Sequence, residues 1–285
     1  HLVKRGRGRG EYLNISDIDV FDSYIYILSS IGQKIIKYDF DGNFIDEYNV
    51  SDWFSCIQVI SETDVRLGNV SNTASGYNFA IFDTKKRRIV EKLDKFKTYS
   101  GYLMDGNDTF VGYNRGETLF SKPFDGRLYS LSDTGVKKLF DVHLSLDNNV
   151  DYDILDNGNL SDIADNCRFT DHFKYFSFVH IVDSMVFCVV NYTSHRIVNH
   201  DSFIKIDMST NDIKTCKTGY VSEPDNKFPY ICGGKIVGYT EDSIIFVLDV
   251  PWVKKTSMKI ADNRFVDIEE NSNPFLFEYK LNFSR

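Results

Sequence analysis

Short runs in which apolar and polar residues alternate follow one another along almost the whole chain. Such runs, rich in β-branched and aromatic side chains, predict β-strands. Asp41-Gly42 lies between two of them and predicts a hairpin turn, because glycine adopts positive φ without strain. The first group of predicted strands comprises 15–20, 24–28, 34–40 and 44–48. Four strands within about 35 residues predict an antiparallel meander.

The same pattern recurs along the chain, with further runs at 77–83, 88–93, 127–131, 136–142, 203–207, 212–217 and 276–281. Aligning the turns gives five units, at Asp39, Asp83, Ser132, Asp207 and Lys280, separated by 44, 49, 75 and 73 residues. The first two intervals fit a propeller blade of roughly 40–50 residues. The two longer intervals predict insertions, for which we identify the polar stretches 147–166, 218–227 and 254–263.

Helical periodicity backed by capping residues is not found in the sequence. Strands without crossover helices predict antiparallel sheets, and many short strands at regular spacing predict a sandwich, barrel or propeller. The repeat of about 45 residues selects the propeller. We therefore predict an all-β fold, a β-propeller of four-stranded antiparallel blades, as a single domain over residues 1–285.

Composition limits the classes of function. The net charge of −8 and the pI near 5.3 argue against a nucleic-acid partner, which needs a basic face. No apolar run approaches the roughly 20 residues of a membrane span. No signal peptide is visible in the sequence. The five cysteines are scattered, and we predict buried free thiols, with one disulfide left open, among Cys56, Cys167, Cys188, Cys216 and Cys232.

Five segments resemble a known family. They are RGRGRGEY at 5–12, IYIL at 25–28, KYDFDGNF at 37–44, FSKPFDGRLYSL at 120–131 and EENSNPFLF at 269–277. In this order they resemble the NHL-like, six-bladed β-propeller family of Bacteroidetes, whose members are often predicted lipoproteins. The chain departs from that family in lacking the blade before the Gly-rich segment and the proline usual near Arg9-Gly10.

The resemblance implies six blades and a secreted protein of the cell envelope, periplasmic or on the outer surface, with a lipid anchor upstream. It implies no established activity and no catalytic residues. The missing first blade predicts either a fragment or a form that closes with five blades.

The sequence contains no complete motif for catalysis or metal binding. The glycines at 6, 8 and 10 lack the third glycine and the following helix of a dinucleotide site, so we predict a blade-connecting loop. The acidic stretch 147–166 has Ile154 and Leu160 where an EF-hand needs Gly and Glu. We predict no catalytic residues, no metal site and no cofactor.

Aromatic residues near strand ends are the better candidates for binding, because aromatic faces stack on sugars and anchor protein partners. Two histidines at strand borders and one arginine were added to them, since a propeller collects site residues from several blades. The predicted ligand-binding residues are Trp53, Tyr77, Tyr102, Tyr113, Arg115, His172, Tyr192 and His195.

The sequence thus predicts a non-catalytic binding protein of the bacterial cell envelope. Its ligand is expected to be a glycan, a peptide or another envelope protein. The alternative is a propeller enzyme, similar to a metal-dependent lactonase or lyase or to a glycosidase, with its site in the central funnel. Fold analogy alone supports that alternative, and one fold hosts many functions.

Overall fold

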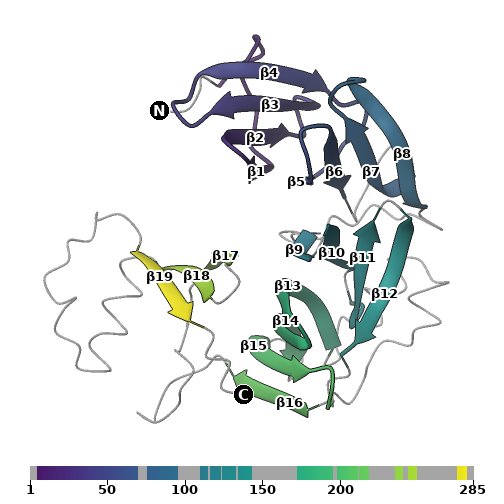
Figure 1. The fold of residues 1–285 in the computed structure, drawn as a ribbon, viewed down its shortest axis with the longest axis vertical. Helices are drawn as coiled ribbons and strands as arrows, with labels where there is room; N and C mark the ends of the chain where they lie inside the picture. The colour runs from purple at the N-terminus through teal and green to yellow at the C-terminus, as the bar shows by residue number, and fades with distance from the viewer. Residues whose placement is uncertain are drawn as a thin grey trace, which may run out of the picture. The chain divides into compact units, whose positions relative to one another are not determined.

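A computed structural model describes the chain in twelve stretches, and every regular element within them is a β-strand (Figure 1). By its contacts the chain forms two compact units, His1–Val179 with Val190–His200, and His180–Val189 with Asp201–Arg285. The described residues are 5–69, 76–95, 110–114, 116–122, 124–132, 134–142, 172–194, 198–210, 212–217, 235–239, 243–248 and 275–280.

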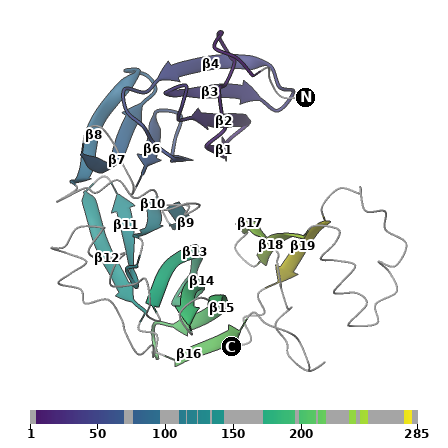
Figure 2. The ribbon, with the colours of Figure 1, turned by 180° about the vertical axis from the view of Figure 1, so that it is seen from behind.

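Sheet 1 is an antiparallel meander in which each strand pairs with the next along the chain. Its strands lie side by side in both views of the ribbon (Figures 1 and 2). They are β1 (Asp17–Phe21), β2 (Tyr24–Ser29), β3 (Lys34–Asp39) and β4 (Phe44–Asn49). All four were predicted from the alternation of apolar and polar residues, to within one or two residues at most ends.

Sheets 2 and 3 repeat this topology. Sheet 2 comprises β5 (Cys56–Val59), β6 (Asp64–Gly68), β7 (Tyr77–Asp83) and β8 (Arg88–Lys95). Sheet 3 comprises β9 (Phe110–Asn114), β10 (Glu117–Ser121), β11 (Arg127–Ser132) and β12 (Gly135–Asp141).

Two further sheets complete the described strands. Sheet 4 comprises β13 (His172–Val182), β14 (Met185–Ser194), β15 (Val198–Asp207) and β16 (Asp212–Lys217). Sheet 5 has three described strands, β17 (Lys235–Tyr239), β18 (Ser243–Leu248) and β19 (Phe275–Lys280). Four-stranded antiparallel meanders are the blades of the predicted propeller fold. The sixth blade and the single domain stay predictions.

The five residues used to align the repeat occupy one structural position. Asp39, Asp83, Ser132, Asp207 and Lys280 are each the last residue of the third strand of their sheet. The sequence repeat therefore corresponds to the structural blade. The predicted insertion 147–166 and the polar stretches 218–227 and 254–263 lie outside the described residues.

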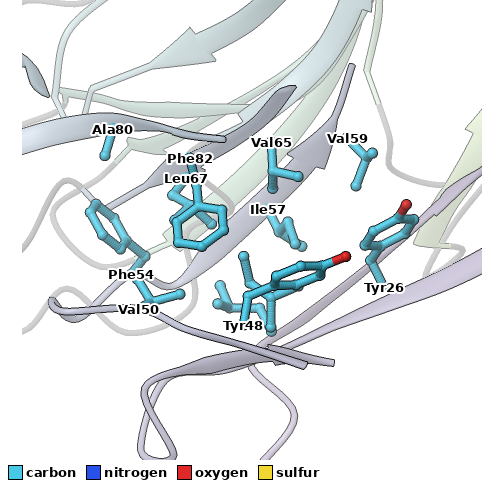
Figure 3. Packing of buried hydrophobic residues seen from close by; sticks show 12 residues of the cluster. Tyr26, Tyr48, Val50, Phe54, Ile57, Val59, Val65, Leu67, Ala80 and Phe82 are labelled. Carbon is cyan, nitrogen blue, oxygen red and sulfur yellow. The ribbon is translucent and has the colours of Figure 1, made fainter. Parts of the chain in front are cut away.

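The largest described core fills the space between sheets 1 and 2. Figure 3 shows the rings of Tyr48 and Phe82 in this cluster, with their centroids 5.9 Å apart. Side chains alternate between the two faces of β2, β3, β6 and β7, so one face of each strand packs into this core. Its buried members are Tyr26, Leu28, Ile35, Tyr48, Val50, Phe54, Ile57, Val59, Val65, Leu67, Ala80 and Phe82.

The opposite face of sheet 1 is covered in part by the Gly-rich segment, which was predicted to connect blades. Gly10 has φ 70° and contacts the Phe44 ring so closely that a Cβ there would lie 2.6 Å from Cδ2. The Glu11 carboxylate accepts a bond from the Gly8 amide at 2.8 Å. Tyr38 donates its hydroxyl proton to the Gly10 carbonyl. The segment is a structural arm packed on sheet 1, and its glycines allow this close approach.

Two carboxylates of sheet 1 accept hydrogen bonds from backbone amides at the edge of sheet 2. Asp17 accepts a bond from the Ile57 amide at 2.8 Å, and Asp19 accepts one from the Val59 amide at 2.6 Å. Both amides belong to β5, the edge strand of its sheet, and unpaired edge groups favour unwanted pairing. Burial raises the pKa of Asp19 above its ordinary value of 3.8, against the lowering effect of the two amides bonded to it, those of Val59 and Val20.

The cysteine prediction is confirmed for the two cysteines that the structure describes in full. Cys56 and Cys188 are buried free thiols. Burial raises the pKa of Cys188 to about 12, so this thiol stays protonated and is a packing residue rather than a nucleophile. The side chains of Cys167, Cys216 and Cys232 lie outside the described residues.

Candidate functional site

Three large apolar side chains are exposed at one end of sheet 1. This end, which we call the Trp53 end, contains the residues before β1, the β2–β3 turn and the β4–β5 connection. The exposed fractions are 44% for Ile15, 64% for Ile31 and 51% for Trp53. The register pairs Asp17 with Leu28 and Lys34 with Asn49, which places these three segments at the same end of the meander. Exposed apolar residues gathered at one place mark an interaction site more often than scattered ones.

Trp53 is held outward by its neighbours in the sequence. Asp52 and Phe54 on either side are buried, whereas Trp53 is 51% exposed. The Trp53 amide donates to the Asp52 carboxylate at 2.8 Å, and its carbonyl accepts a bond from the Asn69 side-chain amide at 3.1 Å. The backbone carrying the indole is therefore fixed before any ligand arrives.

A network of small polar side chains fixes the rest of the Trp53 end. The Asn14 side-chain amide donates to Ser16 at 2.8 Å and to Ser30 at 3.1 Å. Its carbonyl oxygen accepts the Ile31 backbone amide at 2.9 Å. Ser16 in turn donates to Ser30 at 2.6 Å. These bonds tie the segment of Ile15 to the turn of Ile31, so both apolar side chains are presented on a stiff surface.

Tyr77 lies at the matching end of sheet 2. It is the first residue of β7, where β6 ends and the chain returns, and it is half-buried. The Ser55 amide donates to the Gly68 carbonyl at 3.0 Å, and the Asn69 amide donates to the Asn78 carbonyl at 2.8 Å. These bonds connect the Trp53 loop to the residue beside Tyr77. The structure thus brings two of the predicted site residues to corresponding ends of neighbouring sheets.

A polar cluster lies at the same end of sheets 2 and 3. The Asp94 carboxylate accepts a bond from Asn78 at 2.6 Å and is ion-paired with Lys122 at 2.9 Å. Asp125, which is buried, accepts bonds from the Arg127 Nε at 2.7 Å and the Tyr129 hydroxyl at 2.8 Å. The ion pair of Lys122 with Asp94 links sheet 3 to sheet 2, so we interpret the cluster as a support that joins the two sheets.

The other predicted residues are distributed differently. Tyr113 is in β9, near the end of sheet 3 opposite to Lys122, and is half-buried. Tyr192 is half-buried in β14, and His172 is the first residue of β13. Tyr102, Arg115 and His195 lie outside the described residues. A ligand-binding role is tested for none of the eight.

Sequence reasoning missed Ile15 and Ile31. Ile15 was assigned to the first strand, but β1 begins at Asp17 and leaves it before the strand. Ile31 is in the turn between β2 and β3, where polar residues are usual. An isoleucine in the short gap between two predicted strands was the signal that could have identified it.

Three features of the described residues bear on metal binding, proton transfer and membrane insertion. No group of three or more His, Cys, Asp or Glu side chains there is arranged to hold a metal ion. Burial raises the pKa of Tyr26, Tyr38 and Tyr48 to about 12, so these hydroxyls keep their protons. No helix in the described stretches has the length and hydrophobicity to cross a membrane.

The fold defines a class, that of all-β proteins built from four-stranded, antiparallel propeller blades. The chain belongs to the family described as Domain of unknown function (DUF4934), whose model matches residues 1–280. No curated protein matches the sequence. The family is thereby established, and the NHL-like label stays a prediction.

Two solved structures share the fold. A predicted exported protein of Bacteroides fragilis is 16% identical, with a TM-score of 0.69, covering 98% of this chain and 80% of its own. A member of the DUF4221 family from Bacteroides vulgatus is 9% identical, with a TM-score of 0.51, covering 90% of this chain and 76% of its own. At such identities the similarity shows the fold alone.

Proposed function

We propose that this protein is a non-catalytic binding protein of the bacterial cell envelope and that the Trp53 end of sheet 1 contacts its ligand. The observation that carries the proposal is the exposure of Ile15, Ile31 and Trp53 together on segments fixed by hydrogen bonds. A fixed aromatic anchor with apolar neighbours loses little conformational entropy on binding.

Among the predicted ligands, an envelope protein or its peptide fits this surface best. Sugar-binding sites combine an aromatic face with polar groups that bond to hydroxyls, whereas Trp53 is accompanied by two isoleucines. Aromatic and aliphatic side chains at the centre of a contact are typical of protein interfaces. The envelope location is supported by the similarity to a predicted exported protein of Bacteroides fragilis.

Site-specific photo-crosslinking tests the proposal. A benzoylphenylalanine in place of Trp53 keeps an aromatic ring at the site, and intact cells producing the protein are irradiated. We expect a discrete crosslinked product of higher mass, and we expect Ile31→Ser to reduce its yield several-fold, because an exposed anchor contributes up to about 2 kcal/mol.

Phe40 provides the matched control. It is another aromatic residue, 61% exposed, in the β3–β4 turn at the opposite end of sheet 1. The same photoreactive residue at position 40 is expected to give no such product. Equal crosslinking from both positions, or none from position 53, would contradict the proposal. Turnover of a lactone or glycoside that is lost on exchange of a buried carboxylate would favour the enzyme alternative.

A further inference from the structure

The Gly-rich segment, residues 5–12, is held on sheet 1 by an ion pair. Lys34 in β3 and Glu47 in β4 are paired at 3.2 Å, and their side chains are 8% and 26% exposed. Both groups also bond to the backbone of the Gly-rich segment. The Lys34 ammonium donates to the Gly8 carbonyl at 3.0 Å, and the Glu47 carboxylate accepts a bond from the Gly10 amide at 2.9 Å. The Gly-rich segment thus completes the hydrogen bonding of this charge pair.

Lys34 connects the Gly-rich segment to the turn that presents Ile31 at the Trp53 end. It is the first residue of β3, directly after that turn, and its register partner in β2 is Ser29. The turn is tightly packed, because a Cβ on Gly32 would lie 2.8 Å from the Ser29 hydroxyl oxygen and 3.5 Å from Lys34 Cγ. A displacement of Lys34 is therefore transmitted to the turn.

Arg5 connects the Gly-rich segment to the residues before β1. Its Nε donates to the Leu13 carbonyl at 3.2 Å, and Asn14 follows Leu13 in the chain. Asn14 is the residue whose side-chain carbonyl accepts the Ile31 amide at 2.9 Å. The Gly-rich segment therefore contacts both of the segments that the polar network of the Trp53 end joins.

Gly10 seats the Gly-rich segment on sheet 1. It is buried and has φ 70°, and a Cβ on it would lie 2.6 Å from Phe44 Cδ2. Arg5, Arg7 and Arg9 are exposed. Segments with much exposed backbone and few buried contacts open at a lower free energy than the core. The Gly-rich segment is therefore expected to have two states, seated and released, while sheet 1 stays folded.

We propose that the seated Gly-rich segment positions Ile15 and Ile31 of the Trp53 end and so regulates binding of the partner there. This inference rests on the proposed function, which makes that end the contact surface. The seated segment holds both apolar side chains in place before binding. When it is released, the partner must order them, and that cost lowers the affinity. By linkage, a bound partner favours the seated state to the same extent.

Hydrogen exchange of the Ile31 amide in the full chain, followed by NMR, tests the positioning without any partner. Gly10→Val releases the Gly-rich segment, because the new side chain meets the Phe44 ring and a β-branched residue resists positive φ. We expect the Ile31 amide to exchange at least about tenfold faster in this variant. The photo-crosslink from position 53 is expected to fall several-fold in the same variant.

Arg5→Ala is the second variant, and it decides the matter if Gly10→Val does not fold. Arg5 is exposed, so its truncation leaves the core of sheet 1 intact. Loss of its bond to the Leu13 carbonyl is expected to speed exchange of the Ile31 amide in the same direction. Melting temperatures of both variants check that the chain is folded.

Gly42→Val is the matched control, because it places the same side chain at another glycine of positive φ, in the β3–β4 turn at the opposite end of sheet 1. We expect the exchange rate of the Ile31 amide and the crosslink yield to change by less than about twofold there. An unchanged exchange rate in the folded test variants, or an equal increase in Gly42→Val, would overturn the positioning role. Faster exchange with an undiminished crosslink would overturn the regulation. If the parent chain gives no crosslink from position 53, the proposed function fails, and the exchange rates alone decide the positioning.

Discussion

At the scale of single residues, one aspartate recurs as a turn-capping group. Asp39, Asp83 and Asp207 end the third strand of their sheets, and each carboxylate accepts a backbone amide of the following turn. The acceptor distances are 2.8 Å, 2.8 Å and 2.9 Å. Hydrogen bonds to the charged form lower the pKa of all three carboxyls below 3.8.

These shifts predict how stability depends on acid. Because the folded-state pKa values lie below the unfolded value of 3.8, the unfolded chain binds more protons in this range. The contribution of the three carboxylates is complete above pH 3.8 and is lost as the pH falls through their folded-state values. The free energy of unfolding, measured by urea titration between pH 5 and pH 2.5, should therefore decrease towards the acid end.

The triple variant Asp39→Asn, Asp83→Asn, Asp207→Asn should flatten this dependence, because its turns no longer titrate. Phe40→Ser in the first of these turns is the control and should leave the slope unchanged, because neither side chain titrates in this range. Asp19 acts in the opposite sense, since burial raises its pKa and makes its protonation favour the folded state. An unaltered slope in the triple variant would refute the role assigned to the capping aspartates.

At the scale of elements, the hairpins depend on their turn geometry. Gly42 in the β3–β4 turn has φ 83°, and its amide donates to the Asp39 carbonyl at 3.1 Å. A β-branched residue resists this left-handed conformation.

Gly42→Val is expected to lower the free energy of unfolding by about 1 kcal/mol or more. Asp41→Val is the matched control, because Asp41 is in the same turn and has no positive φ. Chemical denaturation of both variants measures the difference. If Gly42→Val were no less stable than Asp41→Val, the turn assignment would be wrong.

At the scale of the whole molecule, we expect the stability of sheet 5 to depend on its last strand, β19. Strand β19 pairs with β18 along its full length, from Ser243–Lys280 to Leu248–Phe275. Without it, β17 and β18 would remain as a two-stranded hairpin among the described strands of sheet 5, and isolated hairpins are marginally stable.

Deletion of 275–280 is therefore expected to abolish the cooperative unfolding of the unit that contains sheet 5. Calorimetry and hydrogen exchange of the truncated chain measure this loss, with a variant that keeps β19 and lacks only 281–285 as the control. A truncated chain that unfolds in the same cooperative transition as the full chain would contradict the prediction.

The blade pattern was readable from the sequence because it is local. Strands with one core-facing side must alternate apolar and polar residues, and tight turns require Gly, Asp or Asn at fixed places. Alignment of Asp39, Asp83, Ser132, Asp207 and Lys280 therefore found the third strand of every described sheet. Trp53 was selected only as an aromatic residue near a predicted strand end, and its exposure is a finding of the structure.

The candidate sites were less readable, since they depend on contacts between distant segments. Ile15, Ile31 and Trp53 come to the same end of sheet 1 through the pairing of four strands, and no local rule states that register. Arg87 likewise bonds to Asp46, 41 residues earlier in the chain. No local pattern in the Gly-rich segment indicated which face of sheet 1 it packs on.

The sequence by itself therefore determined the class of fold, the repeat, the turns and the acidic character, because each is fixed by neighbouring residues or by composition. The tertiary structure alone decided which exposed side chains lie at the same end of a sheet and which carboxylates bind the amides of a strand edge. These properties arise when segments far apart in the chain are brought within hydrogen-bonding distance, and packing, rather than local preference, selects those encounters.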